Sequence, residues 1–170
     1  MLQATLIFRD ATLKDLPRIV EIYNSTVPGR MVTADTELVT VESRLNWFNE
    51  HHADNRPLWV IVNKTSDEIL GWVSFQSFYG RPAYHATAEI SIYLDPAARG
   101  NGLGKIALIY SIDKAKSFGV KTLLAVIFAH NEPSLKLFRN FGFEDWAFLP
   151  NIALLDGIER GVRILGKRIA

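Results

Sequence analysis

Apolar residues near the start of the chain recur at the spacing of an amphipathic helix. Leu16, Ile19, Val20 and Tyr23 fall on one face of such a helix. Asp15 stands directly before this run, and an aspartate there is typical of an N-cap. We therefore predict that the first helix begins after Asp15.

Shorter spacings further along the chain predict strands. Residues 58–62 and 69–75 are apolar, β-branched runs separated by the polar residues 63–68, a pattern typical of an antiparallel hairpin. Residues 87–94 alternate in character and predict a third strand. This alternation places Ile90, Ile92 and Leu94 on one face of that strand and Glu89, Ser91 and Tyr93 on the other.

The remaining elements complete a mixed order. Residues 27–39 have no clean period and predict a long irregular segment, a kind of segment that is often functional. The order β-α-α-β-β-β-α-β-α-β-β indicates a mixed α/β fold with an antiparallel first half and a βαβ second half. The other predicted elements are strands at 5–9, 122–127, 143–149 and 162–169, and helices after a capping Thr40, at 105–117 before Gly119, and from Pro133 to Gly142.

Composition narrows the classes of function. With 170 residues, 48% of them hydrophobic, and no linker-like stretch, we treat residues 1–170 as one domain. A formal net charge of +1 would attract neither nucleic acid nor an acidic membrane, so we expect a small or neutral partner. The chain has no cysteine, and we expect neither a signal peptide nor a membrane span. These features predict a cytoplasmic protein.

The segment after the 87–94 strand carries the strongest functional signal. Gly100, Gly102 and Gly104 alternate just before a predicted helix, with Arg99 and Lys105 at the two edges. Glycine lets the backbone turn sharply and approach an anion, while the free N–H groups of the following helix point toward it. We therefore predict a phosphate-binding loop.

Two familiar phosphate loops fit this segment poorly. A Walker loop needs glycine where Arg99 stands and a hydroxyl side chain where Ile106 follows Lys105. A Rossmann fingerprint needs an acidic residue at the end of the next strand, where Phe128 and Ala129 stand, and it remains a distant alternative.

The arrangement Arg-x-x-Gly-x-Gly, formed by Arg99, Gly102 and Gly104, resembles the pyrophosphate-binding signature of the GNAT superfamily of N-acyltransferases. The resemblance implies the GNAT fold, a mixed central sheet with flanking helices in which two central strands splay apart to form a slot for acetyl-CoA. It also implies acetyl-CoA as the co-substrate.

Glu89 is the candidate general base. An amine must lose a proton before it attacks a thioester, and a carboxylate in apolar surroundings has a raised pKa that suits this task. A glutamate on a solvated face, or one paired with Arg99 or Lys105, is the alternative. Residues 87–94 also resemble the Glu-x-Ser-Val-Tyr-Val strand of the phosphinothricin and methionine sulfoximine acetyltransferases, whose glutamate is held to be the base.

The resemblance, which extends from the first helix to Phe143, implies further site residues. Asn131 would contact the pantetheine arm, although it could equally cap the next helix. The relatives pair, which implies a homodimer. The backbone of Ile92, Tyr93 and Leu94 would bind the acetyl thioester, and the pyrophosphate would be bound by Arg99, Gly100, Asn101, Gly102, Leu103, Gly104 and Lys105.

The acceptor site is expected in the loop at residues 78–84. Arg81 could clamp a carboxylate or could equally be a solvent-exposed arginine in a turn, and the relatives' clamping arginine falls at Tyr79. Tyr84 lies in the same loop. Arg30 is a weaker candidate. The histidines are adjacent to one another or isolated, so no metal is expected. We expect the tryptophans to be core or interface residues rather than ligand platforms.

The chain departs from the family pattern at two places. Phe138 stands where these relatives have histidine and other GNAT enzymes have tyrosine, and residues 156–161 stand where Gly-Arg-Trp-x-Asp is expected.

From the glycine loop, Glu89 and the resemblance, we predict an N-acetyltransferase. It would move acetyl from acetyl-CoA to a small primary amine, an amino acid or an analogue of one, by direct attack in a ternary complex. The alternatives are a protein acetyltransferase and a non-catalytic coenzyme A-binding module.

Overall fold

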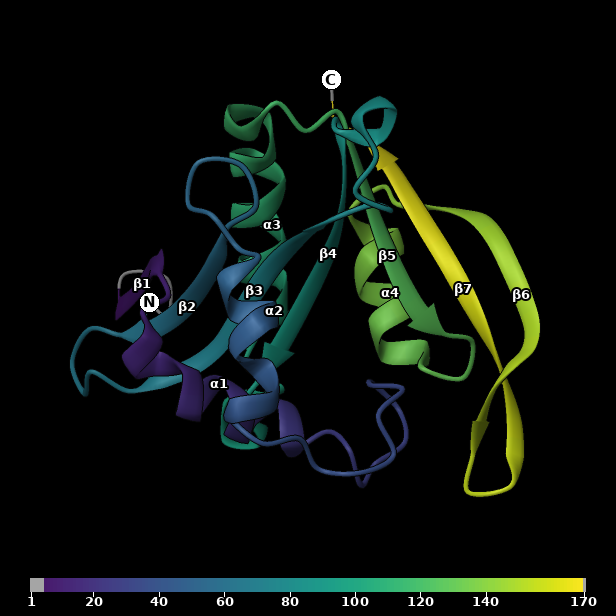
Figure 1. Cartoon of the computed structure of the whole chain (residues 1–170), viewed down its shortest axis with the longest axis horizontal. Coiled ribbons are helices and arrows are strands. Elements are labelled where there is room, and N and C mark those ends of the chain that lie inside the picture. The colour runs from purple at the N-terminus through teal and green to yellow at the C-terminus, as the bar shows by residue number, and fades with distance from the viewer. Residues whose placement is uncertain (1–4, 170) are drawn as a thin grey trace.

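The computed structural model describes residues 5–169, and its strands form one seven-stranded sheet in the order β1-β2-β3-β4-β5-β7-β6 (Figure 1). All neighbours are antiparallel except β4 and β5, which are parallel. The strands are β1 (Leu6–Asp10), β2 (Leu58–Asn63), β3 (Ile69–Ser77), β4 (Thr87–Leu94), β5 (Thr122–Phe128), β6 (Glu144–Leu155) and β7 (Ile158–Arg168).

Helices cover both faces of the sheet, with α1 and α2 over one face and α3 and α4 over the other (Figure 1). No helix within the described residues is long and apolar enough to cross a membrane. The helices are α1 (Leu16–Asn24), α2 (Leu45–Asn49), α3 (Leu103–Ala115) and α4 (Glu132–Asn140). The predicted mixed α/β order is confirmed.

Strand alternation builds two cores, one on each face. On β2, Val60 packs toward α1, whereas its neighbour Ile61 packs toward α3, and both are fully buried. The indole N–H of Trp72, on β3, donates to the Ile19 carbonyl oxygen at 3.1 Å, which fastens α1 to the sheet. The faces predicted for β4 are confirmed, because Ile90 lies in the α3-side core and Tyr93 packs on the α1 side.

The two parallel strands pair over a short distance only. Thr87, Ala88 and Glu89 of β4 face Thr122, Leu123 and Leu124 of β5, and the ladder ends there. The rest of β4 continues to pair with β3 up to Leu94. β4 therefore leaves β5 at Glu89, which is the splay that the family resemblance implied.

Some local expectations need correction. Asp15 occupies the N-cap position of α1, but its carboxylate does not cap that helix. It accepts hydrogen bonds from the Thr12 backbone N–H at 2.7 Å and from the Arg9 guanidinium at 2.7 and 2.9 Å. The final strands are longer than predicted, because β6 and β7 continue into a hairpin that extends past the sheet (Figure 1). The expectation of no signal peptide falls partly on residues 1–4, which lie outside the described range.

We predict that Gly71→Ala destabilises the fold next to the splay. A Cβ at Gly71 would lie 2.7 Å from the Tyr93 carbonyl oxygen, which would force β3 away from β4. The free energy of unfolding should fall by about 1–3 kcal/mol, the usual cost of overpacking. Gly29→Ala is the control, because its Cβ would make an ordinary 3.7 Å contact with the Thr26 carbonyl oxygen. Equal denaturant midpoints for the two variants would contradict this account.

Candidate active site

A cleft opens where β4 separates from β5. Its volume is about 60 Å³, and β4, β5, α4 and Val32 of the first long loop form its walls. Ser91 and Tyr93 reach it from β4 and Val126 reaches it from β5, so both strands of the splay contribute. The lining residues are Val32, Ile90, Ser91, Ile92, Tyr93, Ala125, Val126, Ile127, Asn131, Ser134 and Phe138.

The glycine loop leads from the end of β4 into α3. Gly100 and Gly102 both have a φ of +78°, a conformation that side chains with a Cβ rarely adopt. Gly102 is the N-cap of α3, and apart from its chain neighbours no atom of the described residues lies within 4 Å of where its Cβ would be. The first-turn N–H groups of α3 are therefore free of intrahelical partners beside open space, which suits an anion.

Arg99 fastens this loop to the rest of the fold. Its Nε and Nη2 atoms donate to the Leu94 carbonyl oxygen at 3.1 and 3.0 Å, and Nη2 also donates to Ser25 Oγ at 3.3 Å. Lys105 is exposed on the first turn of α3. The loop thus has one cation that holds its shape and one that faces solvent.

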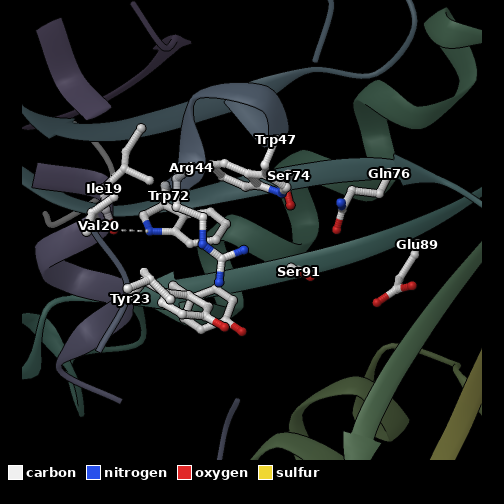
Figure 2. Close-up of a pocket in the computed structure, with 12 residues that line it drawn as sticks. Ile19, Val20, Tyr23, Arg44, Trp47, Trp72, Ser74, Gln76, Glu89 and Ser91 are labelled. Carbon is white, nitrogen blue, oxygen red and sulfur yellow. Dashed lines mark hydrogen bonds between the residues drawn. The ribbon is translucent and has the colours of Figure 1, made fainter. Parts of the chain in front are cut away.

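A second cavity, of about 200 Å³, lies on the α1 and α2 side of the sheet (Figure 2). Glu89, Ser91 and Tyr93 line one wall, and in register beside them on β3 are Gln76, Ser74 and Trp72. The other lining residues are Ile19, Val20, Tyr23, Val39, Arg44 and Trp47. The cavity therefore has a polar part, with Glu89, Gln76 and the two serines, and an aromatic part.

Glu89 is half-buried in this cavity, and burial raises the pKa of its carboxyl above the usual value. Its side chain forms no hydrogen bond or ion pair within the described residues. Figure 2 shows its carboxylate at one end of the cavity, away from the aromatic rings. A carboxylate that is partly withdrawn from water and has no cation beside it accepts a proton more readily than a free one, as a general base must.

Stacked rings form the opposite end of the cavity. Tyr93 stacks on Trp72 with ring centroids 4.4 Å apart, and Trp47 meets Trp72 edge-on at 5.4 Å. The Tyr23 hydroxyl hydrogen-bonds to Thr33 and Asp35. Burial is the main reason that the pKa of Tyr23 and that of Tyr93 are raised, so both phenols stay neutral at ordinary pH.

Comparison with known proteins decides the family. The model of the acetyltransferase (GNAT) family matches residues 16–143. The chain belongs to that family. It is 48% identical, over 95% of its length and 98% of the relative's, to the Bacillus subtilis protein named "Putative phosphinothricin acetyltransferase YwnH".

Two further similarities cover most of the chain. The L-methionine sulfoximine/L-methionine sulfone acetyltransferase of Pseudomonas aeruginosa is 30% identical over 85% of this chain and 83% of that protein. The structure of a GNAT superfamily phosphinothricin acetyltransferase from Sinorhizobium meliloti in complex with AcCoA matches with a TM-score of 0.89 at 27% identity, over 96% of this chain and 88% of that one.

Two of the three residues expected to bind the thioester, Ile92 and Tyr93, line the cleft, whereas Leu94 does not line it. Their contact with the thioester stays a prediction. Asn131 lies at the edge of the cleft, where its Oδ1 accepts from the Ser134 N–H at 3.3 Å, so the capping interpretation is confirmed. Its Nδ2 donates to the Met31 carbonyl oxygen at 2.9 Å. The contact of Asn131 with pantetheine stays a prediction.

Phe138, the position at which the family resemblance led us to expect histidine or tyrosine, also lines the cleft. Its ring is buried and packs edge-on against Phe143 at 5.0 Å. No proton can come from this position. The expected substrate residues Tyr79, Arg81 and Tyr84 do not line the Glu89 cavity.

Those loop residues lie at a separate surface depression of about 590 Å³ that includes Arg81 and Tyr84. Tyr79 is 79% exposed beside them. Arg30, the weaker candidate, is bound by both carboxylate oxygens of Asp156 at 2.8 and 3.0 Å. Whether any of these side chains meets a substrate stays a prediction.

Several cavity residues did not emerge from the sequence. Trp47 and Trp72 were expected to be core or interface residues, yet both also line the cavity. Ser74 was not singled out, although the alternation of residues 69–75 puts it on the same face as Trp72. Arg44 had no local signal at all. Within residues 5–169, no group of three or more acidic or histidine side chains could hold a metal ion.

We predict that Gly102→Val abolishes the binding of coenzyme A. In excess at a hundred times its dissociation constant, the ligand should stabilise the unmodified protein by about 2.7 kcal/mol. Valine at a φ of +78° would distort the loop and block close approach of the backbone.

Gly119→Val is a matched control for this thermal-shift measurement. Gly119 has a φ of +68°, open space around it and no part in the loop. Both variants should melt lower than the unmodified protein, but only Gly119→Val should respond to coenzyme A. A full response of Gly102→Val would remove the loop from the binding site.

Proposed function

We propose that the protein transfers acetyl from acetyl-CoA to the primary amine of a small substrate, an amino acid or an analogue such as phosphinothricin or methionine sulfoximine. One observation carries this proposal. Ser91 and Tyr93 line both the cleft and the Glu89 cavity, so the two spaces meet across the separated end of β4. A thioester in the cleft and an amine in the cavity could therefore make contact.

The residues present fit the co-substrate. The open glycine loop at the start of α3 suits the pyrophosphate, and the unpaired edge of β4 beyond Glu89 offers backbone groups for an extended pantetheine arm. Acetyl-CoA supplies an acyl group activated as a thioester, whose thiol leaving group has a pKa of about 8.5. Such a group leaves as a thiolate without an acid, which is consistent with Phe138.

Glu89 then acts as the base. It takes a proton from the substrate ammonium, either directly or through one water, and leaves a nitrogen lone pair that can attack. The nitrogen–carbon bond then forms, the nitrogen releases its second proton to solvent, and the carbon–sulfur bond breaks. The departing thiolate takes up a proton from solvent, so the protons balance. No cysteine exists in the chain to form a thiol acyl-enzyme.

The relatives support the small-substrate reading, because their names specify phosphinothricin and methionine sulfoximine. The cavity size of about 200 Å³ is also that of a small molecule rather than a protein segment. A protein substrate would need an open groove beside Glu89. Turnover of any small amine would exclude the alternative that the protein is a non-catalytic coenzyme A-binding module.

We predict that Glu89→Gln lowers turnover by about a hundredfold or more while coenzyme A binds as before, because only the proton acceptor is lost. The measurement is thiol release from acetyl-CoA with L-methionine sulfoximine, phosphinothricin or a lysine-containing peptide as the acceptor. In the unmodified protein, kcat should rise as pH increases through the Glu89 pKa, which lies above its usual value.

Glu144→Gln, on the exposed part of β6, is the control for the loss of one carboxylate. It should leave thiol release unchanged. Near-full activity of Glu89→Gln at neutral pH would place the base elsewhere. If only the lysine-containing peptide were acetylated, the protein would be a protein acetyltransferase rather than an enzyme for small amines.

The protein also pairs as a homodimer in this proposal, and it works in the cytoplasm. Support for pairing comes from β6, an edge strand with large apolar side chains in solvent, among them Phe148, Ile152 and Leu154. These side chains would be covered by a second copy.

We predict that light scattering gives twice the chain mass at micromolar concentration. Leu154→Glu should shift the protein toward the monomer, because it places a charge in the covered face. Leu38→Glu is the control, since Leu38 is similarly exposed but lies in the first long loop. A monomeric unmodified protein would overturn the pairing.

A further inference from the structure

We propose that Arg44 binds the carboxylate of the acceptor, so that the Glu89 cavity recognises zwitterionic amino acids from both ends. The inference rests on the proposed acetyl transfer and adds to it the group that selects the substrate. Among the described residues that line this cavity, Arg44 is the one cationic side chain.

The Arg44 guanidinium is held in place from two sides. Its Nη2 donates to Asp35 Oδ2 at 2.5 Å, and its central carbon lies 4.6 Å from the centroid of the Tyr23 ring. Tyr23 in turn hydrogen-bonds to Asp35, so the three side chains fix one another. Figure 2 shows the guanidinium over the Tyr23 ring, and Arg44 lines the same cavity as Glu89.

Most donors of this guanidinium are still available. Within residues 5–169, only Nη2 of Arg44 makes a hydrogen bond, and Nε and Nη1 make none. The arginine side chain is 25% exposed, so it is partly withdrawn from water. A guanidinium that is already positioned and has free N–H groups is suited to bind a carboxylate with two parallel hydrogen bonds.

The two ends of the cavity differ in a way that suits a zwitterion, although Asp35 offsets part of the Arg44 charge through one of its N–H groups. Asp35 and Arg44 form an ion pair at the aromatic end, and Glu89 supplies a negative charge at the other end. The α-ammonium of an amino acid would lie toward Glu89 and the carboxylate toward Arg44. An amide or a decarboxylated amine would satisfy only the Glu89 end.

Ser74 provides an independent sign that a polar ligand enters. It is 1% exposed, it lines the cavity, and its Oγ has no hydrogen-bond partner within the described residues. It lies opposite Ser91 in the register of β3 and β4, between the two charged ends. Buried hydroxyl groups are nearly always paired, so we assign the Ser74 Oγ to the acceptor as well.

The other arginines considered are less suitable. Both carboxylate oxygens of Asp156 already bind Arg30, and Arg81 lines a different depression on the surface. Arg44 is thus the arginine that shares a cavity with the proposed base.

The test compares an L-amino acid with its carboxamide. In Arg44→Gln, the Michaelis constant for the acid should rise roughly ten- to hundredfold, since a hydrogen bond to a charged group is lost, while that for the amide should hardly change. Arg44→Lys keeps the charge but not the paired geometry, so its Michaelis constant for the acid should lie between those of the unmodified protein and Arg44→Gln. Arg139→Gln breaks an exposed arginine–aspartate pair elsewhere and should change neither constant.

Binding followed by tryptophan fluorescence gives a readout that needs no turnover, because Trp47 and Trp72 line the cavity. The acid should bind to the unmodified protein and to Glu89→Gln, but weakly to Arg44→Gln. If no amine is acetylated yet this binding depends on Arg44, the proposed reaction fails and the inference stands.

Three outcomes would overturn the inference while leaving acetyl transfer intact. Acid and amide could be used equally by the unmodified protein. Arg44→Gln could weaken both alike, which would show a structural role only. Arg81→Gln could remove the preference for the acid while Arg44→Gln preserved it. Arg44→Lys decides the matter if the melting temperature of Arg44→Gln shows that it is poorly folded.

Discussion

The site depends on the end of one short ladder of hydrogen bonds. β4 and β5 are paired from Thr87 to Glu89 and then diverge, while β4 stays attached to β3 as far as Leu94. Backbone groups within a sheet normally satisfy each other, so an edge that opens inside a sheet is available to an extended ligand. The same divergence places Glu89 at the last paired position, where it lines the cavity, and the cleft begins at the next residue, Ile90.

The two faces of β4 have different roles, because side chains alternate along a strand. Ile90 and Ile92 point into the apolar side, where α3 and α4 cover the sheet. Glu89 and Ser91 point to the side of α1 and α2, where the acceptor cavity lies. The eight residues of β4 therefore contribute side chains to the core, border the cleft and include the proposed base.

The sequence predicted best what is encoded locally. The bounds of β4, the glycine loop and the position of Glu89 depend on neighbouring residues, and their pattern was sufficient for the family as well. The predicted helix at 105–117 was correct in kind, but α3 begins two residues earlier, at Leu103. Arg44 and Trp47 reach the cavity from a segment far from β4 in the chain, and only tertiary packing brings them there. Asp15 shows a related limit on a small scale, because the folded positions of its near neighbours Arg9 and Thr12 decided what its carboxylate binds.

The unpaired state of Glu89 also affects the stability of the protein. Since burial raises the pKa of its carboxyl, the folded chain binds this proton more tightly than the unfolded chain does. The stabilising contribution is complete below the unfolded pKa and is lost as pH rises through the folded pKa. The form of Glu89 that can act as a base is therefore the form that the fold favours less, and the protein gives up some stability at the pH where it would be active.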